Sequence, residues 1–218
     1  FRARRRLDIG LKYGEAFTNK VAAIPGVVSA TLAGSTRRRK ETIGDLDVVV
    51  TVADEDHEAV ANAILNLNGI ADVKGASDSK ISLILDTSIF EEGFTVGHID
   101  SNVLEAIGGD DYEQLESGGT IDAQVRLVPP HVAAFTLAYF TGSKEHNIAM
   151  RQRAISKGLR LNEFGLIPDI EAGELKGMAA AKFSLAATTE QEIYAHLGMQ
   201  WVTPELREDT GEVIAAEL

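Results

Sequence analysis

The alternation of apolar and polar residues predicts helices and strands in turn over the first part of the chain. Ala16, Val21 and Ile24 recur at helical spacing, and Pro25 with the following glycine ends that helix. The run 46–52 is apolar on both faces, which is typical of a central strand. The expected elements are a helix over 13–24, strands over 27–33 and 46–52, a helix over 55–67, and strands over 81–85 and 121–128.

Residues 86–119 interrupt this pattern, because they are rich in Gly, Asp and Glu with only scattered apolar positions. A loop of that length inside a compact domain is unusual. We therefore interpret 86–119 as an insertion between two strands of one sheet, with a short helix near 103–107. Pro129 and Pro130 stop the strand that follows the insertion.

From residue 132 onward the apolar spacing is helical. We expect helices over 132–140 and 147–157, and a third helix that begins with the capping-box pair Thr189 and Glu192. The pattern as a whole predicts an α/β (α+β) fold. A mixed β-sheet flanked by helices is expected first, and a small, mostly helical domain is expected after it.

Composition narrows the classes of function. The 218 residues include no cysteine, which excludes disulfides and thiolate metal sites and fits a reducing compartment best. No apolar run reaches the roughly 18 residues that a membrane helix needs. The net charge of −12 is unfavourable for a general nucleic-acid binder, although basic clusters stand at 2–6 and 37–40. The chain does not begin with methionine, so we expect a fragment or processed product of a longer protein.

The stretch 33–50, AGSTRRRKETIGDLDVVV, combines an anion-binding pattern with two carboxylates. Asp45 and Asp47 are two residues apart on a strand and so project to one face, where hard oxygen ligands suit Mg²⁺. Gly34 lets an anion approach the backbone, Ser35 adds a hydroxyl donor, and the arginines can bind phosphate oxygens in pairs. Together these groups predict transfer of a nucleotidyl group from a triphosphate.

Each of these features has a plainer interpretation when it stands alone. A lone Asp-x-Asp pair is mostly a solvated turn or a strand end, and a basic run such as 37–40 is mostly a solvated face. The combination is far more specific. Gly-Ser at 34–35, followed by Gly-Asp-x-Asp at 44–47 and a Val-rich strand, matches the nucleotidyltransferase superfamily signature.

The second half of the chain resembles DNA polymerase family X, the beta-like repair polymerases. The run 139–166, YFTGSKEHNIAMRQRAISKGLRLNEFGL, carries this resemblance. RRRKETIGDLDVVV and the run 188–208, TTEQEIYAHLGMQWVTPELRE, are similar to the bacterial and archaeal branch called PolX. The resemblance covers nearly the whole chain except 86–119.

This resemblance implies a catalytic nucleotidyltransferase palm over 1–128, with the 86–119 insertion, and a nucleotide-selecting helical domain over 129–208. In the PolX branch a helix-hairpin-helix domain precedes this region and a PHP phosphoesterase domain follows it. Residues 209–218 resemble the linker that leads toward the PHP domain. We therefore interpret the chain as the palm and helical domain of a longer protein.

The resemblance also implies roles for single residues. Asp45 and Asp47 match metal-binding carboxylates, and the implied cofactor is a pair of Mg²⁺ ions, with Mn²⁺ as a substitute. Taken alone, Tyr139 and Phe140 would be ordinary helix core, and Arg151 an ordinary solvated charge. The positions that match dNTP contacts are Gly34, Ser35, Arg38, Gly44, Tyr139, Phe140, Gly142 and Asn147, and those that match contacts to template or DNA are Arg151, Asn162 and Glu163.

A third carboxylate is expected on a neighbouring strand, written Val-Asp-x-Arg in the family. Here the run 120–130 is TIDAQVRLVPP. Counting back from Arg126 places Gln124 at the position of the acid, and Asp122 lies two residues earlier on the same face. Either a β-bulge restores Asp122 as the third catalytic and metal-binding residue, or Gln124 truly replaces the acid. We expect Asp122.

The resulting hypothesis is a template-directed DNA polymerase core that fills short gaps in DNA repair. Its expected partners are a dNTP and gapped or primer–template DNA, with no membrane, and it is expected to act as a monomer in the cytoplasm near the nucleoid. One alternative is a family member that binds dNTP or DNA with weakened catalysis. Another is a nucleotidyltransferase that acts on a different acceptor, against which YFTGSKEHN argues because it belongs to the polymerase helical domain.

Overall fold

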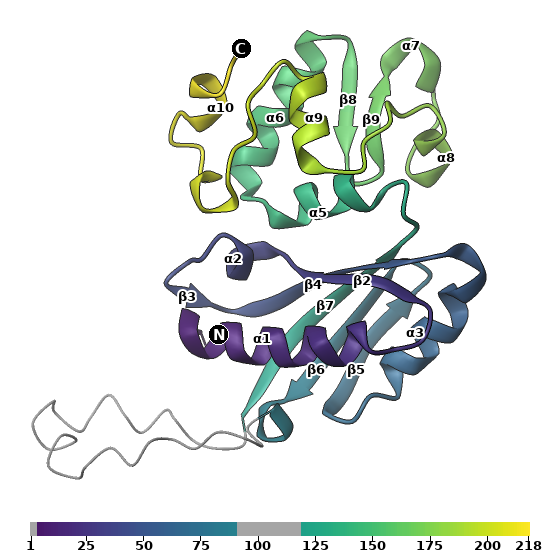
Figure 1. Ribbon diagram of the computed structural model, residues 1–218, viewed down its shortest axis with the longest axis vertical. Coiled ribbons are helices and arrows are strands. Elements are labelled where there is room, and N and C mark those ends of the chain that lie inside the picture. Colours follow the sequence, from purple (N-terminus) through teal and green to yellow (C-terminus); the bar gives the residue numbers. More distant parts are fainter. Residues whose placement is uncertain (1–3, 91–118) are drawn as a thin grey trace, which may run out of the picture.

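A computed structural model of the protein describes residues 4–90 and 119–218 (Figure 1). The lower part in Figure 1 is built on a five-stranded sheet with the strand order β2-β4-β7-β6-β5. Its strands are β2 (Val27–Leu32), β4 (Asp45–Val52), β5 (Ile70–Ser77), β6 (Lys80–Asp86) and β7 (Thr120–Val128). The pair β4–β7 is parallel and the other neighbours are antiparallel, so the predicted mixed sheet is confirmed.

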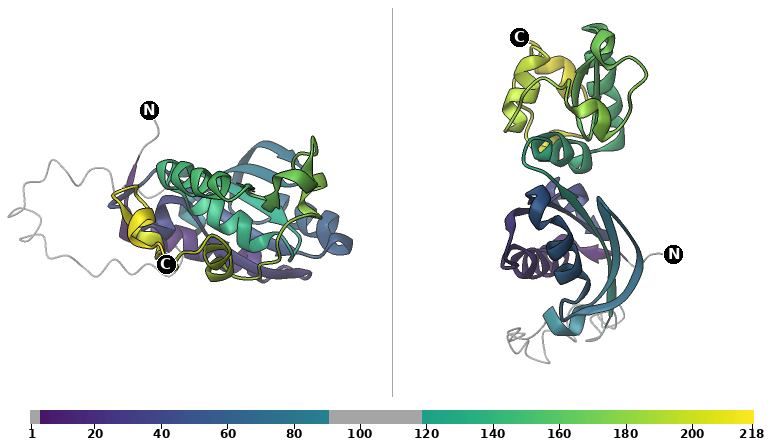
Figure 2. Two further views of the ribbon diagram at one scale, coloured as in Figure 1. Left: turned by 90° about the horizontal axis from the view of Figure 1, so that it is seen from above. Right: turned by 90° about the vertical axis from the view of Figure 1, so that its right-hand side faces the viewer.

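Two helices, α1 (Leu7–Ala22) and α3 (His57–Leu65), cover one face of this sheet, as Figure 2 shows. Their buried side chains, among them Phe17 and Ile64, pack on alternate residues of the strands, such as Leu46 and Val48 of β4. Because successive strand residues point to opposite faces, the residues between these apolar positions point away from the two helices. The charged residues of β4 therefore lie on the other face.

The remaining elements of the lower part are short. They are the strands β1 (Arg5–Arg6) and β3 (Thr42–Ile43), the helix α2 (Gly34–Arg37), and the 3₁₀ turns η1 (Asp54–Asp56) and η2 (Thr87–Phe90). β1 pairs with β3, so the start of the described chain is tied to the segment just before β4. The short helix expected near 103–107 lies outside the described residues.

The upper part in Figure 1 has its own core, formed by residues such as Phe135, Met150 and Tyr194. Its helices are α5 (Ala133–Thr141), α6 (Lys144–Ser156), α7 (Asp169–Ala172), α8 (Met178–Ala181), α9 (Glu190–His196), the 3₁₀ turn η4 (Pro204–Leu206) and α10 (Glu212–Ala215). The predicted capping box of α9 is present. The two largest cores lie on either side of residue 129, and a smaller apolar cluster with Val49 and Val132 joins the two parts. The domain boundaries themselves stay a prediction.

Four features of the fold differ from expectation. The helix α1 begins at Leu7, and β5 is a strand that the pattern did not predict, because its residues 71–77 are exposed. The mostly helical part also contains a hairpin of β8 (Leu159–Asn162) and β9 (Gly165–Pro168). Val213 of the segment expected as a linker packs into the second core.

In the described ranges, no helix combines the length and apolar character that crossing a membrane requires.

Candidate nucleotide-binding and active site

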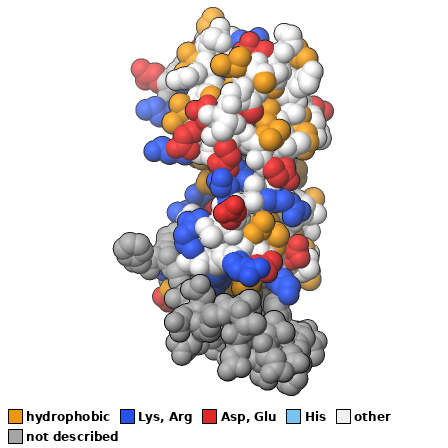
Figure 3. Space-filling model, turned by 90° about the vertical axis from the view of Figure 1, so that its left-hand side faces the viewer, with side chains coloured by type: hydrophobic (Ala, Val, Ile, Leu, Met, Phe, Trp, Pro, Cys, Tyr) orange, Lys and Arg blue, Asp and Glu red, His pale blue; other side chains and the backbone are white. Residues whose placement is uncertain are grey.

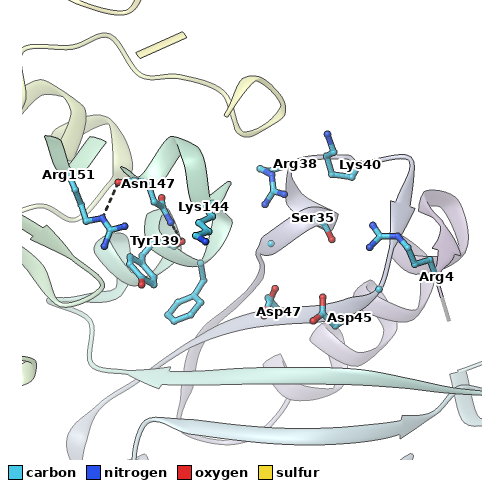
Figure 4. A pocket seen from close by; sticks show the side chains of 14 residues that line it. Arg4, Ser35, Arg38, Lys40, Asp45, Asp47, Tyr139, Lys144, Asn147 and Arg151 are labelled. Atoms are coloured by element: carbon cyan, nitrogen blue, oxygen red, sulfur yellow. Dashed lines mark hydrogen bonds between the residues drawn. The ribbon is translucent and has the colours of Figure 1, made fainter. Parts of the chain in front are cut away.

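A cavity of about 510 Å³ lies where the two parts of the chain meet (Figure 4). The lower part contributes the β4 carboxylates and the basic loop before them, and the upper part contributes α5 and α6. Most of the predicted site residues line this one cavity. They are Gly34, Ser35, Arg38, Gly44, Asp45, Asp47, Tyr139, Phe140, Gly142, Asn147 and Arg151.

The two carboxylates stand side by side at the start of β4. Asp45 and Asp47 alternate with the buried Leu46, so both point away from the α1–α3 face and toward the cavity, as Figure 4 shows. The backbone N–H of Ala33 donates to the carbonyl oxygen of Asp47 at 2.8 Å, which holds the Gly-Ser loop against the strand. Gly34 is required here, because its φ is +61° and a Cβ atom would collide with the Asp47 carboxylate.

The basic run 37–40 is not the plain solvated face that a run of this kind usually forms, because each of its residues pairs with an acid of the upper part. Arg38 and Lys40, which line the cavity, lie 2.8 and 3.4 Å from the carboxylate of Glu208. A second hydrogen bond of 2.5 Å joins the Arg38 guanidinium to the carbonyl oxygen of Thr141. Figure 3 shows Lys and Arg side chains gathered around acidic ones in the middle of the molecule, between its upper and lower parts. The predicted triphosphate-binding cation thus stands in the cavity wall with a carboxylate as its present partner.

Glu190 at the start of α9 is the buried centre of this charge network. Its carboxylate accepts from Arg37 at 2.7 Å and from Arg207 at 2.7 Å, and Arg207 is fully buried. Burial alone would raise the pKa of Glu190, but the hydrogen bonds from the two arginines outweigh it and lower the pKa to about 2. Sequence analysis missed this residue, and Arg37 and Glu190 stand too far apart along the chain for any local pattern to signal their pairing.

The opposite wall of the cavity is formed by the end of α5 and the outer face of α6. The side-chain amide of Asn147 donates to the backbone carbonyl of Tyr139 at 2.7 Å, so the two helices hold each other in place. Arg151 follows one turn later on α6 and points into the same region (Figure 4). Phe140 stacks under the guanidinium of Arg126 at 4.1 Å from the ring centroid, which joins this wall to β7.

Two predicted DNA contacts lie outside the main cavity. The side-chain oxygen of Asn162 accepts from the backbone N–H groups of Phe164 and Gly165, so it caps the β8–β9 turn. Asn162 also borders a smaller neighbouring pocket together with Arg151. The backbone carbonyl of Glu163 accepts from the Thr136 hydroxyl at 2.8 Å. Their contact with DNA stays a prediction.

Three cavity residues were not predicted as site residues. Arg4, Lys40 and Lys144 add positive charge around the carboxylates. Arg4 is held there by two hydrogen bonds to Thr42, at 2.8 and 2.7 Å. A basic cluster near the start of the chain was the only sequence signal for Arg4, and the sequence does not place that cluster beside β4.

Comparison with known proteins agrees with this geometry. Residues 136–208 match the family model described as DNA polymerase beta thumb. The chain is 32% identical over 211 residues to the DNA polymerase/3'-5' exonuclease PolX of Bacillus subtilis, and this match covers 95% of the chain and 30% of that relative. It is 32% identical over 185 residues to DNA polymerase lambda of Arabidopsis thaliana (84% of the chain, 32% of the relative) and 26% over 192 residues to that of Rattus norvegicus (84% and 29%).

These matches show the resemblance to DNA polymerase family X. The resemblance stated from the sequence is therefore confirmed. The chain spans about a third of the length of these curated relatives, and the thumb match falls on the part that contains α5, α6 and α9.

The position of the third carboxylate departs from the family X pattern. β7 pairs with β4 and β6 without any break in register, so the bulge that would restore Asp122 is absent. Gln124 is level with Asp47, and Asp122 is level with Asp45. Asp122 does not line the cavity, and its carboxylate lies 2.7 Å from the ammonium group of Lys74. The structure thus places the neutral Gln124, not an acid, beside Asp47, while the role of Asp122 as a metal ligand stays a prediction.

The carboxylates that face the cavity suit one hard cation better than two. Asp45 and Asp47 offer two neighbouring carboxylates that face the cavity, which suits Mg²⁺. Within residues 4–90 and 119–218, no cluster of three or more Asp, Glu or His side chains is arranged to hold a metal ion. The described side chains therefore supply ligands for one of the two expected Mg²⁺ ions.

Proposed function

We propose that this chain is the nucleotidyl-transfer core of a family X DNA polymerase, which adds a nucleotide from a dNTP to the 3′-OH of a primer and fills short gaps during repair. One observation carries the proposal. A single cavity brings together a carboxylate pair, a group of phosphate-binding cations and a wall of α5 and α6 side chains that can contact a sugar and a base.

The cations would hold the triphosphate. Arg38 offers a planar guanidinium that can bind two phosphate oxygens at once, and Lys40 and Lys144 add point charges from the two sides of the cavity. Ser35 and the open backbone at Gly34 give a close approach for a phosphate oxygen. Arg38 and Lys40 would exchange the carboxylate of Glu208 for phosphate as the nucleotide enters.

Asp45 and Asp47 would hold a divalent cation, Mg²⁺ or Mn²⁺, which when bound neutralises phosphate charge and makes the α-phosphate easier to attack. The residues themselves orient the reaction. With the cation bound, the carboxylates would position the reacting end of the nucleotide at the sheet, and the basic loop would position the other end. Holding the primer hydroxyl and the phosphate in line supplies much of the rate enhancement in such reactions.

The α5–α6 wall would select the nucleotide. Tyr139 lies at the end of α5, and its carbonyl anchors Asn147, so both present a fixed surface to the sugar and the base. Arg151, one turn further along α6, would reach toward the template strand. We infer that the partners are a dNTP and gapped or primer–template DNA, that one copy of the chain suffices, and that the protein works in the cytoplasm beside the nucleoid.

A second candidate function is favoured by one observation. Gln124 stands beside Asp47 where an acid would take the proton from the primer hydroxyl, and an amide does not accept a proton near neutral pH. A chain of this kind would bind nucleotide and DNA normally but extend a primer slowly.

Primer extension across a one-nucleotide gap, with Mg²⁺ and then Mn²⁺, tests the proposal. We expect extension by the full chain, and a loss on the order of 10²-fold or more in Asp47→Asn. The matched control is Asp72→Asn, an exposed acid on β5 outside the cavity, which should extend normally. Nucleotide binding without extension under either metal would favour the second candidate, and absence of both binding and extension would refute the two functions together.

A further inference from the structure

The face of the sheet that carries the carboxylates continues across three more strands. Parallel pairing puts Asp122 beside Asp45 and Gln124 beside Asp47, on the same face. Neighbouring strands lie about 4.8 Å apart, so the side chains of each pair are immediate neighbours. On β7, the residue level with Asp47 is therefore an amide. The acid of that strand, Asp122, lies two residues earlier on the same face.

Lys74 reaches this face from the edge strand β5. Val73 pairs with Leu83 and Gly75 pairs with Ser82, so Lys74 is the extra residue of a β-bulge. Bulges of this kind redirect a side chain, and the Lys74 ammonium group lies 2.7 Å from Asp122 across the intervening strand β6. Asp122 is mostly covered, with 19% of its side chain exposed. A positive charge that belongs to the chain thus lies beside Asp122, the one acid of β7.

We propose that this site holds one divalent cation with its nucleotide, at Asp45 and Asp47, and that Gln124 together with the Lys74–Asp122 ion pair excludes a second. The inference rests on the proposed function, because it concerns the nucleotide bound in the cavity described above. Two ions about 3.5–4 Å apart need shared anionic oxygens between them. Next to Asp47 the chain supplies a neutral amide, and next to Asp45 it supplies a carboxylate that already has a cation beside it.

The charges around Gln124 also disfavour a second divalent ion. A second divalent ion near Gln124 would have to share the two β4 carboxylates with the first ion, and the nearby Asp122 carboxylate is already paired with the positive charge of Lys74. Like charges in a partly covered site repel each other more strongly than in bulk water. The consequence for the reaction concerns the primer hydroxyl, because the β7 residue level with Asp47 is an amide, which does not take its proton. We expect the chemical step to be slow and nucleotide binding to be ordinary.

The direct test counts bound Mn²⁺ by electron paramagnetic resonance, in the full chain saturated with a dNTP analogue that has a non-hydrolysable α,β linkage. The wild-type chain should bind one Mn²⁺, and Gln124→Asp should bind two. Asp122→Asn should still bind one, because Asp122 is not a ligand of the ion. Two Mn²⁺ in the wild-type chain, one of them lost in Asp122→Asn, would overturn the inference, and this arm does not depend on how well Gln124→Asp folds.

Primer extension by the same variants gives a second readout. Gln124→Asp should raise kcat on the order of 10²-fold, while the KM for dNTP changes little. An unchanged kcat in a folded Gln124→Asp that binds two Mn²⁺ would contradict the assignment of the slow step. Failure of the proposed function would be distinguishable from failure of this inference, because the analogue would then not bind at all in a calorimetric titration of the wild-type chain.

Discussion

The replacement Glu190→Gln should destabilise the helical part of the chain by about 3 kcal/mol at pH 7. Glu190 is 5% exposed and accepts four hydrogen bonds from Arg37 and Arg207, at distances of 2.7 to 3.1 Å. Its pKa falls from an ordinary 4.5 to about 2 in the folded chain. At 1.36 kcal/mol per pKa unit, that fall corresponds to about 3 kcal/mol of stability, which matches the loss seen when one partner of a buried pair is removed.

The pH dependence has a definite sign. Because the pKa of Glu190 is lower in the folded than in the unfolded chain, its contribution is fully present above about pH 4.5 and is lost as the pH falls toward 2. The difference in unfolding free energy between wild type and Glu190→Gln should therefore be largest at pH 7. It should narrow between pH 4.5 and pH 3.

Urea denaturation followed by Trp201 fluorescence measures this difference. Trp201 is the single tryptophan of the chain, and its ring lies 5.9 Å from the Arg207 guanidinium, so it reports on the same part of the fold. The matched control is Glu205→Gln, whose pair with Arg39 is exposed and 3.6 Å long. Such a pair contributes at most about 1 kcal/mol. Equal losses in the two variants, or a gap that stays constant from pH 7 to pH 3, would refute the reasoning.

Two further predictions concern the cavity. Glu208→Gln should lower the Kd for a dNTP about three- to tenfold, because it removes the carboxylate that competes with phosphate for Arg38 and Lys40; calorimetry with the non-hydrolysable analogue measures this, and an unchanged or weaker affinity would contradict it. Gly34→Ala should weaken the same binding by about tenfold or more, because the methyl group meets the Asp47 carboxylate at a positive φ. Normal affinity in Gly34→Ala would show that the loop beside β4 does not contact the nucleotide.

The parts of the site that are close in sequence were predictable. Gly34, Asp45 and Asp47 lie in one short stretch whose strand period fixes their common face, and the cavity contains all three. The apolar spacing likewise located the core strands, and the pair Thr189 and Glu192 located the capping box of α9. Local pattern sufficed wherever one element, or a loop and the strand after it, determined the arrangement.

The parts that depend on distant residues were not predictable. Glu190 gains its importance from Arg37, which belongs to the lower part of the molecule and lies far away in sequence. β5 is exposed along nearly its whole length and so lacks the apolar alternation that marks a strand, and the bulge that redirects Lys74 is set by its pairing with β6. Counting back from Arg126 pointed to Gln124, but only the register of β7 shows that no bulge brings Asp122 to the same position.

Template-directed selection in a one-nucleotide gap tests the central claim most directly. The full chain is given the four dNTPs one at a time, with Mn²⁺ and long incubation, on four gapped substrates that differ only in the template base. A polymerase core whose nucleotide lies between β4 and the α5–α6 wall should add the complementary nucleotide in each case. Addition that ignores the template base, or no addition while the dNTP analogue binds and competes with dNTPs, would contradict the assignment of this chain as a template-directed polymerase core.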